Sequence, residues 1–482
     1  MKRLTALFTR TAGELARAPR LICTADTPLQ ELLTRMRECG CNHAVVLREQ
    51  RQLRGLITPH SLIRHLGEHG HGLATARAAD AMEPAPTLVS AAEPLYRLTP
   101  AFHSDAPLLV VTESGALHGL IQPQDLLRLL AAPALSAGGV ATTDLAALKR
   151  DQETIARELL SEGMTATDIQ QVLTAMNDDL CRRAVDAVTT GLELDGWGRP
   201  PVPFCLLLMG SGGRAESLLA PDQDNGLILD DYPDTAHGTI DRYFAEFALR
   251  LTHRLDEAGL PLCPGHVMAS NPLWRKTRTQ WRGQLQYWIR HRSPQALLNA
   301  SILLDMRGNV GEPTLAEELR EAMLKSIAAA PGFLRALLVN ESVKQVGLGW
   351  FDHLQTEGDD SPHAGQFNLK RNGMMPLVEA VRLYALAAGI NASSTVNRLA
   401  GLRAAGKLDT DEHDALCEAF EYLCTLQLRQ QLADLASGRP AGRHVPPEAL
   451  TRREQEQLVR SLKTAEALLR TVRHTLLGGD TS

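Results

Sequence analysis

The pattern of hydrophobic and polar positions divides the chain into mixed strand-and-helix regions and an almost wholly helical last third. Short apolar runs at 204–209 and 225–229 predict buried strands, and a third strand is expected at 265–269. Before them, residues 144–194 carry apolar positions at helical spacing. From about Glu312 onward the pattern is helical, which favours an antiparallel helical bundle.

The first third of the chain contains an internal repeat. Residues 43–66 align without gaps onto residues 107–130, with ten identities in 24 positions. Each copy reads as a helix, an apolar strand, a polar turn, a second strand ending in Gly-Leu-Ile and a closing amphipathic helix. This order resembles a tandem pair of CBS domains over residues 15–132, and the small residues at 133–143 suit a linker.

The resemblance to CBS pairs implies a regulatory site for an adenosine nucleotide. The family's ribose-contacting pattern places Thr and Asp three residues apart, whereas this chain has Thr58 with Ser61 in one copy and Gln122 with Asp125 in the other. A carboxylate accepts both ribose hydroxyl protons, and a serine hydroxyl is a weaker acceptor. We therefore predict weak or altered binding through Thr58 and Asp125. CBS pairs also associate through their helical faces, which implies a homodimer.

Composition narrows the class of protein. The 482 residues suggest about three domains. Hydrophobic residues at 44% and charged residues at 22% exclude disorder of the whole chain, and 4% aromatic residues favour helix over an all-β sandwich. The net charge of -6 argues against nucleic acid as a partner. Since no apolar run approaches the ~20 residues of a membrane helix, we expect a cytoplasmic protein without membrane contact.

The residues that suit phosphate chemistry lie between the first two strands of the middle region. Gly-Ser-Gly-Gly at 210–213 follows one strand, and Asp222 and Asp224 precede the next. Side chains at i and i+2 of an extended segment leave the same face, so these two carboxylates would point the same way and suit Mg²⁺. The backbone N–H groups of the Gly-rich turn suit phosphate oxygens, and Ser211 adds a hydroxyl donor.

Three kinds of phosphate site compete as explanations of this segment. A Walker-type loop is excluded because the turn has no lysine. A dinucleotide fingerprint fits Gly210, Gly212 and Ala215, with Asp230 twenty residues beyond Gly210. However, a parallel crossover needs a dozen or more residues with a real helix, and Pro221 interrupts after two turns. A nucleotidyltransferase arrangement fits best, and its chemistry is in-line attack on the α-phosphorus of a nucleotide.

The segment 210–229 resembles the signature of a bacterial nucleotidyltransferase family related to PII uridylyltransferase, in which Gly-Arg-x-Glu and Asp-x-Asp-Asn recur. Residues 262–274 and 304–307 resemble later segments of the same domain, and residues 368–377 and 394–399 resemble the family's helical substrate-binding domain. The family places CBS or cyclic-nucleotide-binding modules before these two domains. The resemblance therefore covers nearly the whole chain.

The resemblance implies an α/β multidomain protein. We expect a CBS pair at 15–132, a helical linker with a polymerase-β-like mixed-sheet domain at 133–311, and an all-α helical bundle at 312–482. The implied activity is Mg²⁺-dependent transfer of a nucleotidyl group from an NTP, ATP or UTP, to an unknown acceptor. We expect that acceptor to be a regulatory protein in signalling, with the CBS pair regulating the transfer.

The expected site residues follow from the same resemblance. Asp222 and Asp224 would hold Mg²⁺, and nucleotide binding is expected from Gly210, Ser211, Gly212, Gly213, Arg214, Glu216, Lys370 and Arg371. Polymerase-β-like enzymes add a third carboxylate on a later strand, and the expected strand at 265–269 has none. Asp305 is either that third catalytic acid or a structural partner of Arg307. The alternative function is a non-enzymatic nucleotide sensor with a degenerate transferase domain.

Overall fold

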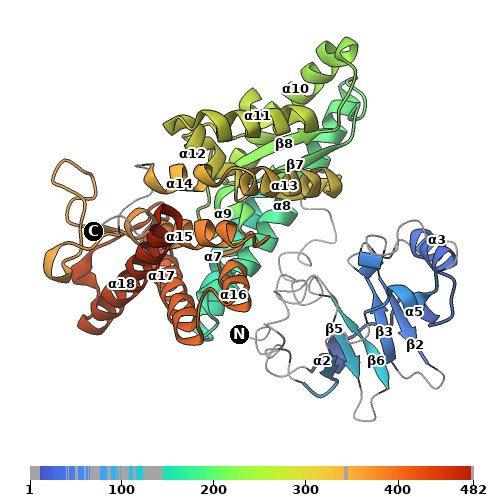
Figure 1. Cartoon of the computed structure of the whole chain (residues 1–482), viewed down its shortest axis with the longest axis horizontal. Helices are drawn as coiled ribbons and strands as arrows, with labels where there is room; N and C mark the ends of the chain where they lie inside the picture. The colour runs from blue at the N-terminus through green and yellow to red at the C-terminus, as the bar shows by residue number, and fades with distance from the viewer. Residues whose placement is uncertain are drawn as a thin grey trace. The chain divides into compact units, whose positions relative to one another are not determined.

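The chain forms two compact units, residues 1–141 and residues 142–482 (Figure 1). The computed structural model describes residues 11–39, 41, 43–48, 53–58, 61–62, 64–65, 76–83, 88–93, 95, 98, 108–111, 116–122, 145–340 and 346–478.

The first unit contains two three-stranded sheets of the same design. Their strands, in sheet order, are β1 (Ile22–Thr24), β2 (Ala44–Leu47) and β3 (Leu53–Ile57), then β4 (Leu88–Ser90), β5 (Leu108–Val111) and β6 (Leu117–Ile121). In each sheet the first pair of strands is parallel and the second is antiparallel. Val46 lies opposite Gly55 in one sheet as Val110 lies opposite Gly119 in the other. The repeat in the sequence is therefore a structural repeat.

The two glycines of this repeat have the same structural cause. A side-chain carbon at Gly55 would approach the Glu83 carbonyl oxygen to 2.6 Å, and one at Gly119 would approach the Arg17 carbonyl oxygen to 2.9 Å. In both places a second backbone segment lies antiparallel beside the strand and forms hydrogen bonds with the residue after the glycine. Among its described residues, the helices of this unit are α2 (Ala12–Leu15), α3 (Leu29–Cys39) and α5 (Ala78–Ala81).

The second unit is built on a four-stranded sheet. In spatial order its strands are β10 (Arg307–Gly311), β7 (Phe204–Leu208), β8 (Asn225–Leu229) and β9 (Arg275–Thr277). β7 and β8 are antiparallel neighbours, which excludes the parallel crossover of a dinucleotide fold. The two strands expected at 204–209 and 225–229 are confirmed.

The strand expected at 265–269 is wrong, and β9 lies further along the chain. Asn225 N donates to Val267 O at 3.0 Å, so this segment does run beside the start of β8. It does not continue as a ladder, because His266 has a positive φ of 53° and the chain turns there. The apolar residues Val267 and Ala269 are buried in this turn instead of in a strand.

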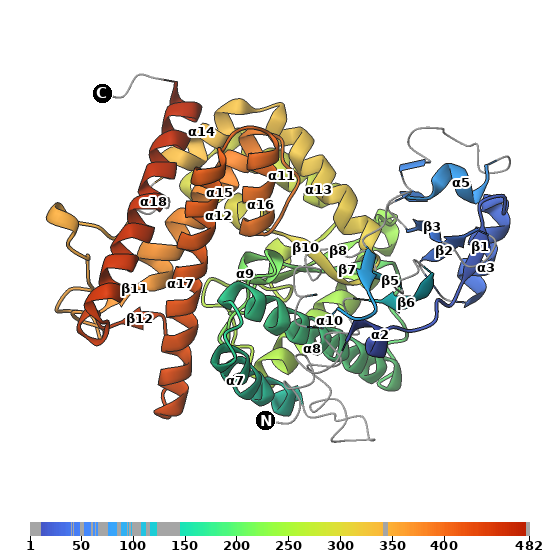
Figure 2. The same ribbon diagram turned by 90° about the horizontal axis from the view of Figure 1, so that it is seen from below.

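Helices cover both faces of this sheet (Figures 1 and 2). Phe204 of β7 packs against Phe244 and Phe247 of α10, with ring centroids 5.6 and 5.2 Å away. Cys205 points to the opposite face, where Gly308 leaves room for Ala316 of α13. The helices of this part of the unit are α7 (Leu145–Ser161), α8 (Ala166–Leu194), α9 (Gly210–Gly213), α10 (His237–Glu257), α11 (Arg278–His291), α12 (Pro294–Leu303), α13 (Pro313–Ala328) and α14 (Pro331–Val339).

The last part of the second unit is the expected helical bundle. Its helices are α15 (Met375–Ala387), α16 (Thr395–Ala404), α17 (Thr410–Ala436) and α18 (Arg452–Leu477). α17 and α18 lie side by side, and each begins with a capping box (Figure 2). Two short strands, β11 (Phe367–Asn368) and β12 (His444–Val445), pair beside a π-helix at Leu369–Met374.

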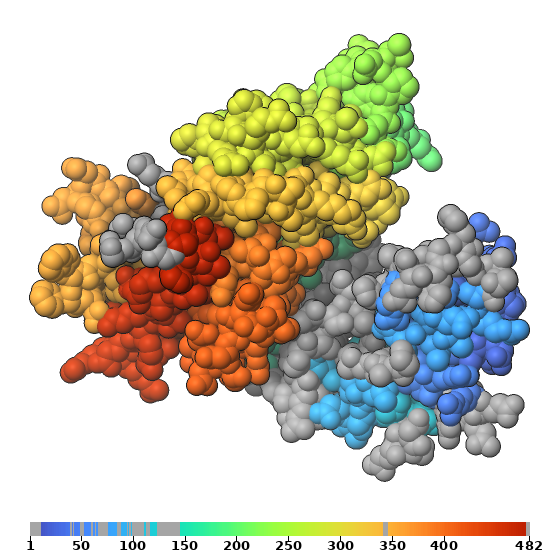
Figure 3. Space-filling view, viewed as in Figure 1, coloured from blue at the N-terminus to red at the C-terminus, as the bar shows by residue number. Residues whose placement is uncertain are grey.

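The bundle packs directly on the sheet domain. α13 contacts α15, and α14 contacts α15 and α18; on the face shown in Figure 3 they meet the C-terminal helices directly. Within the described residues, no single helix has the length and apolar composition to cross a membrane, although the bent pair α13 and α14 meets those criteria jointly.

Candidate functional site

The antiparallel pairing of β7 and β8 brings the Gly-rich turn beside the acid pair. Met209 N donates to Asp224 O at 2.8 Å, which holds the end of one strand against the start of the next. Gly210 then adopts a positive φ of 55°, and a side-chain carbon there would overlap the Asp224 carboxylate. Glycine is required at this position for its backbone conformation and because the carboxylate lies over its Cα atom. The structure thus brings together the two patterns that the sequence singled out.

The turn itself is a single helical turn with open N–H groups. Gly213 N donates to Met209 O and Arg214 N donates to Gly210 O, which closes the turn. The first N–H groups of any helical turn have no acceptor within it, so those of the turn's first residues are free of intrahelical bonds. Ala215 follows with a positive φ of 58° and ends the turn. These N–H groups suit anionic phosphate oxygens.

The two acids have different surroundings. Asp222 Oδ2 lies 3.7 Å from Lys370 Nζ, which comes from the π-helix of the C-terminal domain. Burial raises the pKa of Asp224 above its usual range, while the Cys263 thiol and the Lys370 ammonium partly oppose that rise. Burial and the nearby Asp224 carboxylate raise the pKa of Cys263 to about 11, so this thiol stays protonated and able to donate. Asp224 is therefore a half-buried carboxylate whose charge is only partly compensated, and a cation would stabilise it.

The acid pair fits a divalent cation that binds together with a nucleotide. Mg²⁺ in proteins is usually held by one or two carboxylates and completed by substrate phosphates and water. Asp222 and Asp224 supply the carboxylates, and the turn beside them suits the phosphates. Across the described ranges, no group of three His, Cys, Asp or Glu side chains forms a metal site complete in itself.

The structure separates the two predicted cations of the C-terminal domain. Lys370 faces the acid pair, and burial lowers the pKa of its ammonium group while Asp222 and Asp224 oppose that shift. The charge of Arg371 instead acts on Glu357, whose pKa is lowered first by its hydrogen bond from Asn368. Of the two residues, Lys370 is the one that the fold brings to the acids.

A further cation, which acts on Lys370, was not identified from the sequence. Leu369 N donates to Arg443 O at 2.9 Å, because β12 runs beside the start of the π-helix. The Arg443 charge thereby acts on Lys370. No local pattern marks Arg443, since it reaches Lys370 only through the pairing of β11 with β12.

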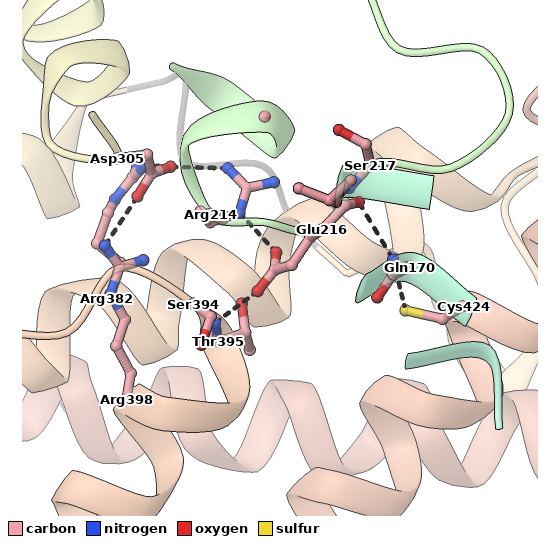
Figure 4. A network of polar contacts seen from close by, with 12 residues as sticks. Gln170, Arg214, Glu216, Ser217, Asp305, Arg382, Ser394, Thr395, Arg398 and Cys424 are labelled. Carbon is pink, nitrogen blue, oxygen red and sulfur yellow. Dashed lines mark hydrogen bonds and ion pairs between the residues drawn. The ribbon is translucent and has the colours of Figure 1, made fainter. Parts of the chain in front are cut away.

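Arg214 and Glu216 lie in a buried network (Figure 4). Arg214 Nε donates to Glu216 Oε2, and Arg214 Nη1 donates to Asp305 Oδ2, both at 2.7 Å. Glu216 Oε1 accepts from the backbone N–H of Thr395, the first residue of α16. The geometry commits these side chains to contacts within the protein.

Asp305 is the centre of the same network. Arg382 Nη1 donates to its Oδ2 at 2.8 Å, and Arg398 Nη2 donates to its Oδ1 at 2.9 Å. These guanidinium groups outweigh burial and hold the pKa of Asp305 far below its usual range. The pairing with Arg307 that the sequence suggested is wrong, because Arg307 pairs with Asp178 at 2.7 Å. With both oxygens engaged by arginines, Asp305 has the surroundings of a structural acid.

The arginines that hold Asp305 were not identified from the sequence. Arg382 lies within the apolar run of α15, and Arg398 is 1% exposed on α16. An arginine inside an apolar helical run is almost never buried unpaired, and this was the available signal. Its partner was not readable, because Asp305 lies far away along the chain.

In the first unit, Thr58 and Ser61 bond to each other. Thr58 N donates to Ser61 Oγ at 3.0 Å, and Ser61 N donates to Thr58 Oγ1 at 3.1 Å. The hydroxyl of Thr58 donates to Glu83 Oε1 at 2.9 Å, and that of Ser61 donates to the Thr58 carbonyl oxygen. Asp125, the other predicted regulatory residue, lies outside the described residues.

Comparison with known proteins identifies three family models along the chain. The model described as "Putative nucleotidyltransferase DUF294" matches residues 150–295, and "Putative nucleotidyltransferase substrate binding domain" matches residues 331–476. Together these two models match more than half of the chain. A CBS domain model matches residues 12–68. No curated protein matches the chain.

Solved structures of CBS domains are similar to the first part of the chain. A CBS domain-containing protein of unknown function from Bacillus anthracis is 16% identical, with a TM-score of 0.25 over 27% of this chain and 98% of its own. The CBS-pair protein CBSX2 of Arabidopsis thaliana is 19% identical, with a TM-score of 0.23 over 27% of this chain and 99% of its own. The CBS domain of a bacterial CNNM/CorC family Mg²⁺ transporter in complex with ATP is 21% identical, with a TM-score of 0.23 over 26% of this chain and 91% of its own.

Proposed function

Because the chain belongs to the nucleotidyltransferase family that these two domain models describe, we propose that it is a CBS-regulated, Mg²⁺-dependent nucleotidyltransferase. It transfers a nucleotidyl group from ATP or UTP to an acceptor, which we take to be a regulatory protein in signalling. The single observation that supports this most is the packing of the Asp224 carboxylate against Gly210. That contact places a carboxylate pair directly beside a turn suited to phosphates.

Each residue of the site has a role in this reaction. Asp222 and Asp224 hold Mg²⁺, which when bound neutralises phosphate charge and orients the reacting oxygens. The backbone N–H groups at 210–213 and the Ser211 hydroxyl bind the β- and γ-phosphates. Lys370, whose ammonium nitrogen lies 3.7 Å from Asp222 Oδ2, binds the triphosphate from the C-terminal domain.

The bonds that change are those of an in-line displacement. An acceptor oxygen attacks the α-phosphorus, the bond between that phosphorus and the oxygen bridging to the β-phosphate breaks, and pyrophosphate leaves with the electron pair. The acceptor loses its proton to the surrounding solvent. Lys370 and the turn stabilise the negative charge that develops on the leaving pyrophosphate.

A second function is favoured by the surroundings of Asp305. Both oxygens of Asp305 accept hydrogen bonds from arginines. None of the residues proposed for the site therefore supplies the third carboxylate of polymerase-β-like enzymes. A nucleotide-sensing protein without transfer activity needs the turn, Lys370 and the acid pair, and it does not need a third acid. The two functions share a binding site and differ in turnover.

The test compares wild type with Asp222→Asn and Asp224→Asn. Labelled ATP and UTP are incubated with each protein, Mg²⁺ and cell extract, and labelled products and pyrophosphate are measured. Loss of a metal ligand should reduce turnover by roughly two orders of magnitude or more while the fold persists. Equal turnover in all three proteins would refute the mechanism. Nucleotide binding without any turnover in the wild type would favour the sensor.

A further inference from the structure

A buried ion-pair bridge joins the Gly-rich turn to the C-terminal helices (Figure 4). We call it the Asp305 bridge, and its members are Arg214, Glu216, Asp305, Arg382, Thr395 and Arg398. We propose that the helical domain holds the phosphate-binding turn in its shape through this bridge. Arg398 and Glu216 are then positioning residues for the nucleotide site. The inference depends on the proposed function only in naming the turn as the place where phosphates bind.

On the side of the sheet domain, the bridge contacts the turn at its end. Arg214 follows the four residues of the turn directly, and its guanidinium is fixed by Glu216 and Asp305. The backbone of Asp305 also packs against Gly213, where any side-chain carbon would overlap its carbonyl oxygen. A shift of Asp305 would therefore move the turn by two routes, through Arg214 and through this backbone contact.

On the side of the helical domain, two helices reach into the bridge. Arg382 comes from α15, and Arg398 comes from α16. The start of α16 is also fixed, because the backbone N–H of Thr395 donates to Glu216 Oε1. The negative carboxylate at this helix N-terminus complements the helix dipole. Glu216 thus contacts both Arg214, at the end of the turn, and Thr395, at the start of α16.

The burial of the bridge makes the coupling strong. Its members are between 0% and 7% exposed. Buried charges are stable only when they are paired, so displacement of one member leaves its partners unpaired in a medium where that is costly. Three arginines face two carboxylates, and Asp305 alone accepts from all three of them. Loss of the Arg398 contact would let Asp305 and then Arg214 rearrange.

A second contact between the same two domains provides a matched control. Glu421 of α17 accepts from Ala166 N at 2.6 Å and from Thr167 N at 3.0 Å, at the first turn of α8. The Thr167 hydroxyl also donates to Glu421, at 2.7 Å. These bonds fasten the helical bundle to α8 without touching the Gly-rich turn. If the Asp305 bridge only held the two domains together, its loss would have the same effect on the turn as loss of the Glu421 contact.

The deciding experiment is hydrogen exchange measured on the full chain. The amides of Gly213, Arg214 and Glu216 are hydrogen-bonded in the turn, so their exchange reports its local opening. In Arg398→Met these amides should exchange faster by about tenfold or more, while in Glu421→Gln they should stay within about twofold of wild type. Amides of β7 are the internal reference for global unfolding. Equal exchange of the turn in the two variants would overturn the proposal.

A second variant separates a positioning role from a general loss of structure. Arg398→Lys keeps a positive charge next to Asp305, so it should restore part of the protection of the turn. If Arg398→Met does not fold, the test uses Arg398→Lys alone. Exchange of the turn amides in Arg398→Lys at the wild-type rate would then overturn the proposal.

Ligand binding also distinguishes a positioning role from a purely structural one, because only a positioning role predicts that one of two affinities changes. In Arg398→Met, the affinity for inorganic tripolyphosphate in the presence of Mn²⁺ should fall by about tenfold, while the affinity for Mn²⁺ alone stays within about twofold. A fall in both affinities, or in neither, would contradict the positioning role. A wild type that binds no tripolyphosphate would contradict the proposed function, and the exchange measurement would still decide the bridge.

Discussion

Lys370 Nζ lies 3.7 Å from Asp222 Oδ2, so a cation of the helical domain faces the carboxylate pair of the sheet domain. The same ammonium group acts on Asp224 and limits the rise of its pKa. A metal ion that approaches the pair without nucleotide must therefore compete with this ammonium. A bound triphosphate would offer Lys370 an alternative anionic partner, which links metal and nucleotide binding.

Replacement of Lys370 by methionine should change two affinities in opposite directions. Mn²⁺ alone should bind more tightly, because the competing ammonium is gone, whereas Mg²⁺-ATP should bind about tenfold more weakly, because a charged contact to phosphate is lost. Calorimetry with each ligand measures both. Arg371→Ala is the comparison, and its effects should be smaller because its charge acts on Glu357. A fall in both affinities would contradict the competition.

Asp224→Asn should stabilise the protein while it removes metal binding. The folded-state pKa of Asp224 is raised, so its charged form opposes folding, and wild-type stability falls as the pH rises from about 4 through that raised pKa. Asparagine carries no charge at any pH. The variant should therefore melt at a higher temperature than wild type near pH 8 and at nearly the same temperature near pH 4. Asp222→Asn, which loses its ion pair with Lys370, should give no such gain.

Asp305 should contribute stability that is lost in acid. Its folded-state pKa lies far below the value of about 3.9 expected in the unfolded chain, so the contribution is complete above about pH 5 and declines as the pH falls further. Asp305→Asn leaves the arginines without their anion and should cost about 3–5 kcal/mol at pH 7. Urea unfolding between pH 3 and 7 should show a weaker pH dependence in the variant. The variant should keep its affinity for the metal ion, and loss of that affinity would indicate that Asp305 is a metal ligand.

Adenosine nucleotides should bind weakly to the CBS pair. The hydroxyl of Thr58 donates to Glu83, and that of Ser61 donates to a backbone carbonyl, so neither proton is available to a ribose. Calorimetry of the full chain with AMP, without divalent metal, should give a dissociation constant weaker than roughly micromolar. Micromolar or tighter binding that is abolished by Thr58→Ala would contradict this prediction.

The protein should form a homodimer in solution. This prediction rests on the resemblance of the first unit to CBS pairs and on the prevalence of twofold symmetry among oligomers. Light scattering should give twice the 52.5 kDa of one chain over a wide concentration range. A mass of one chain throughout that range would refute it.

Much of the local architecture was available from the sequence. The repeat in the first unit is visible because strands alternate and turns recur at the same spacing, and both sheets repeat the register at Gly55 and Gly119. The proximity of Gly210 to Asp224 was predictable for a related reason. Both residues lie next to the ends of two consecutive strands, and a short connection between such strands makes them neighbours in the sheet.

The tertiary structure decided which charged residues act together. Nothing near Asp305 in the sequence indicates Arg382 or Arg398, and only the packing of α15 and α16 brings them to it. Likewise, Lys370 reaches Asp222 because β11, β12 and the π-helix place it there. Periodicity and spacing report on neighbours within a few residues, since they follow from the geometry of one helix or strand. Contacts between distant segments depend on how whole elements pack, and in this protein that packing separates the open acid pair from the buried Asp305 bridge.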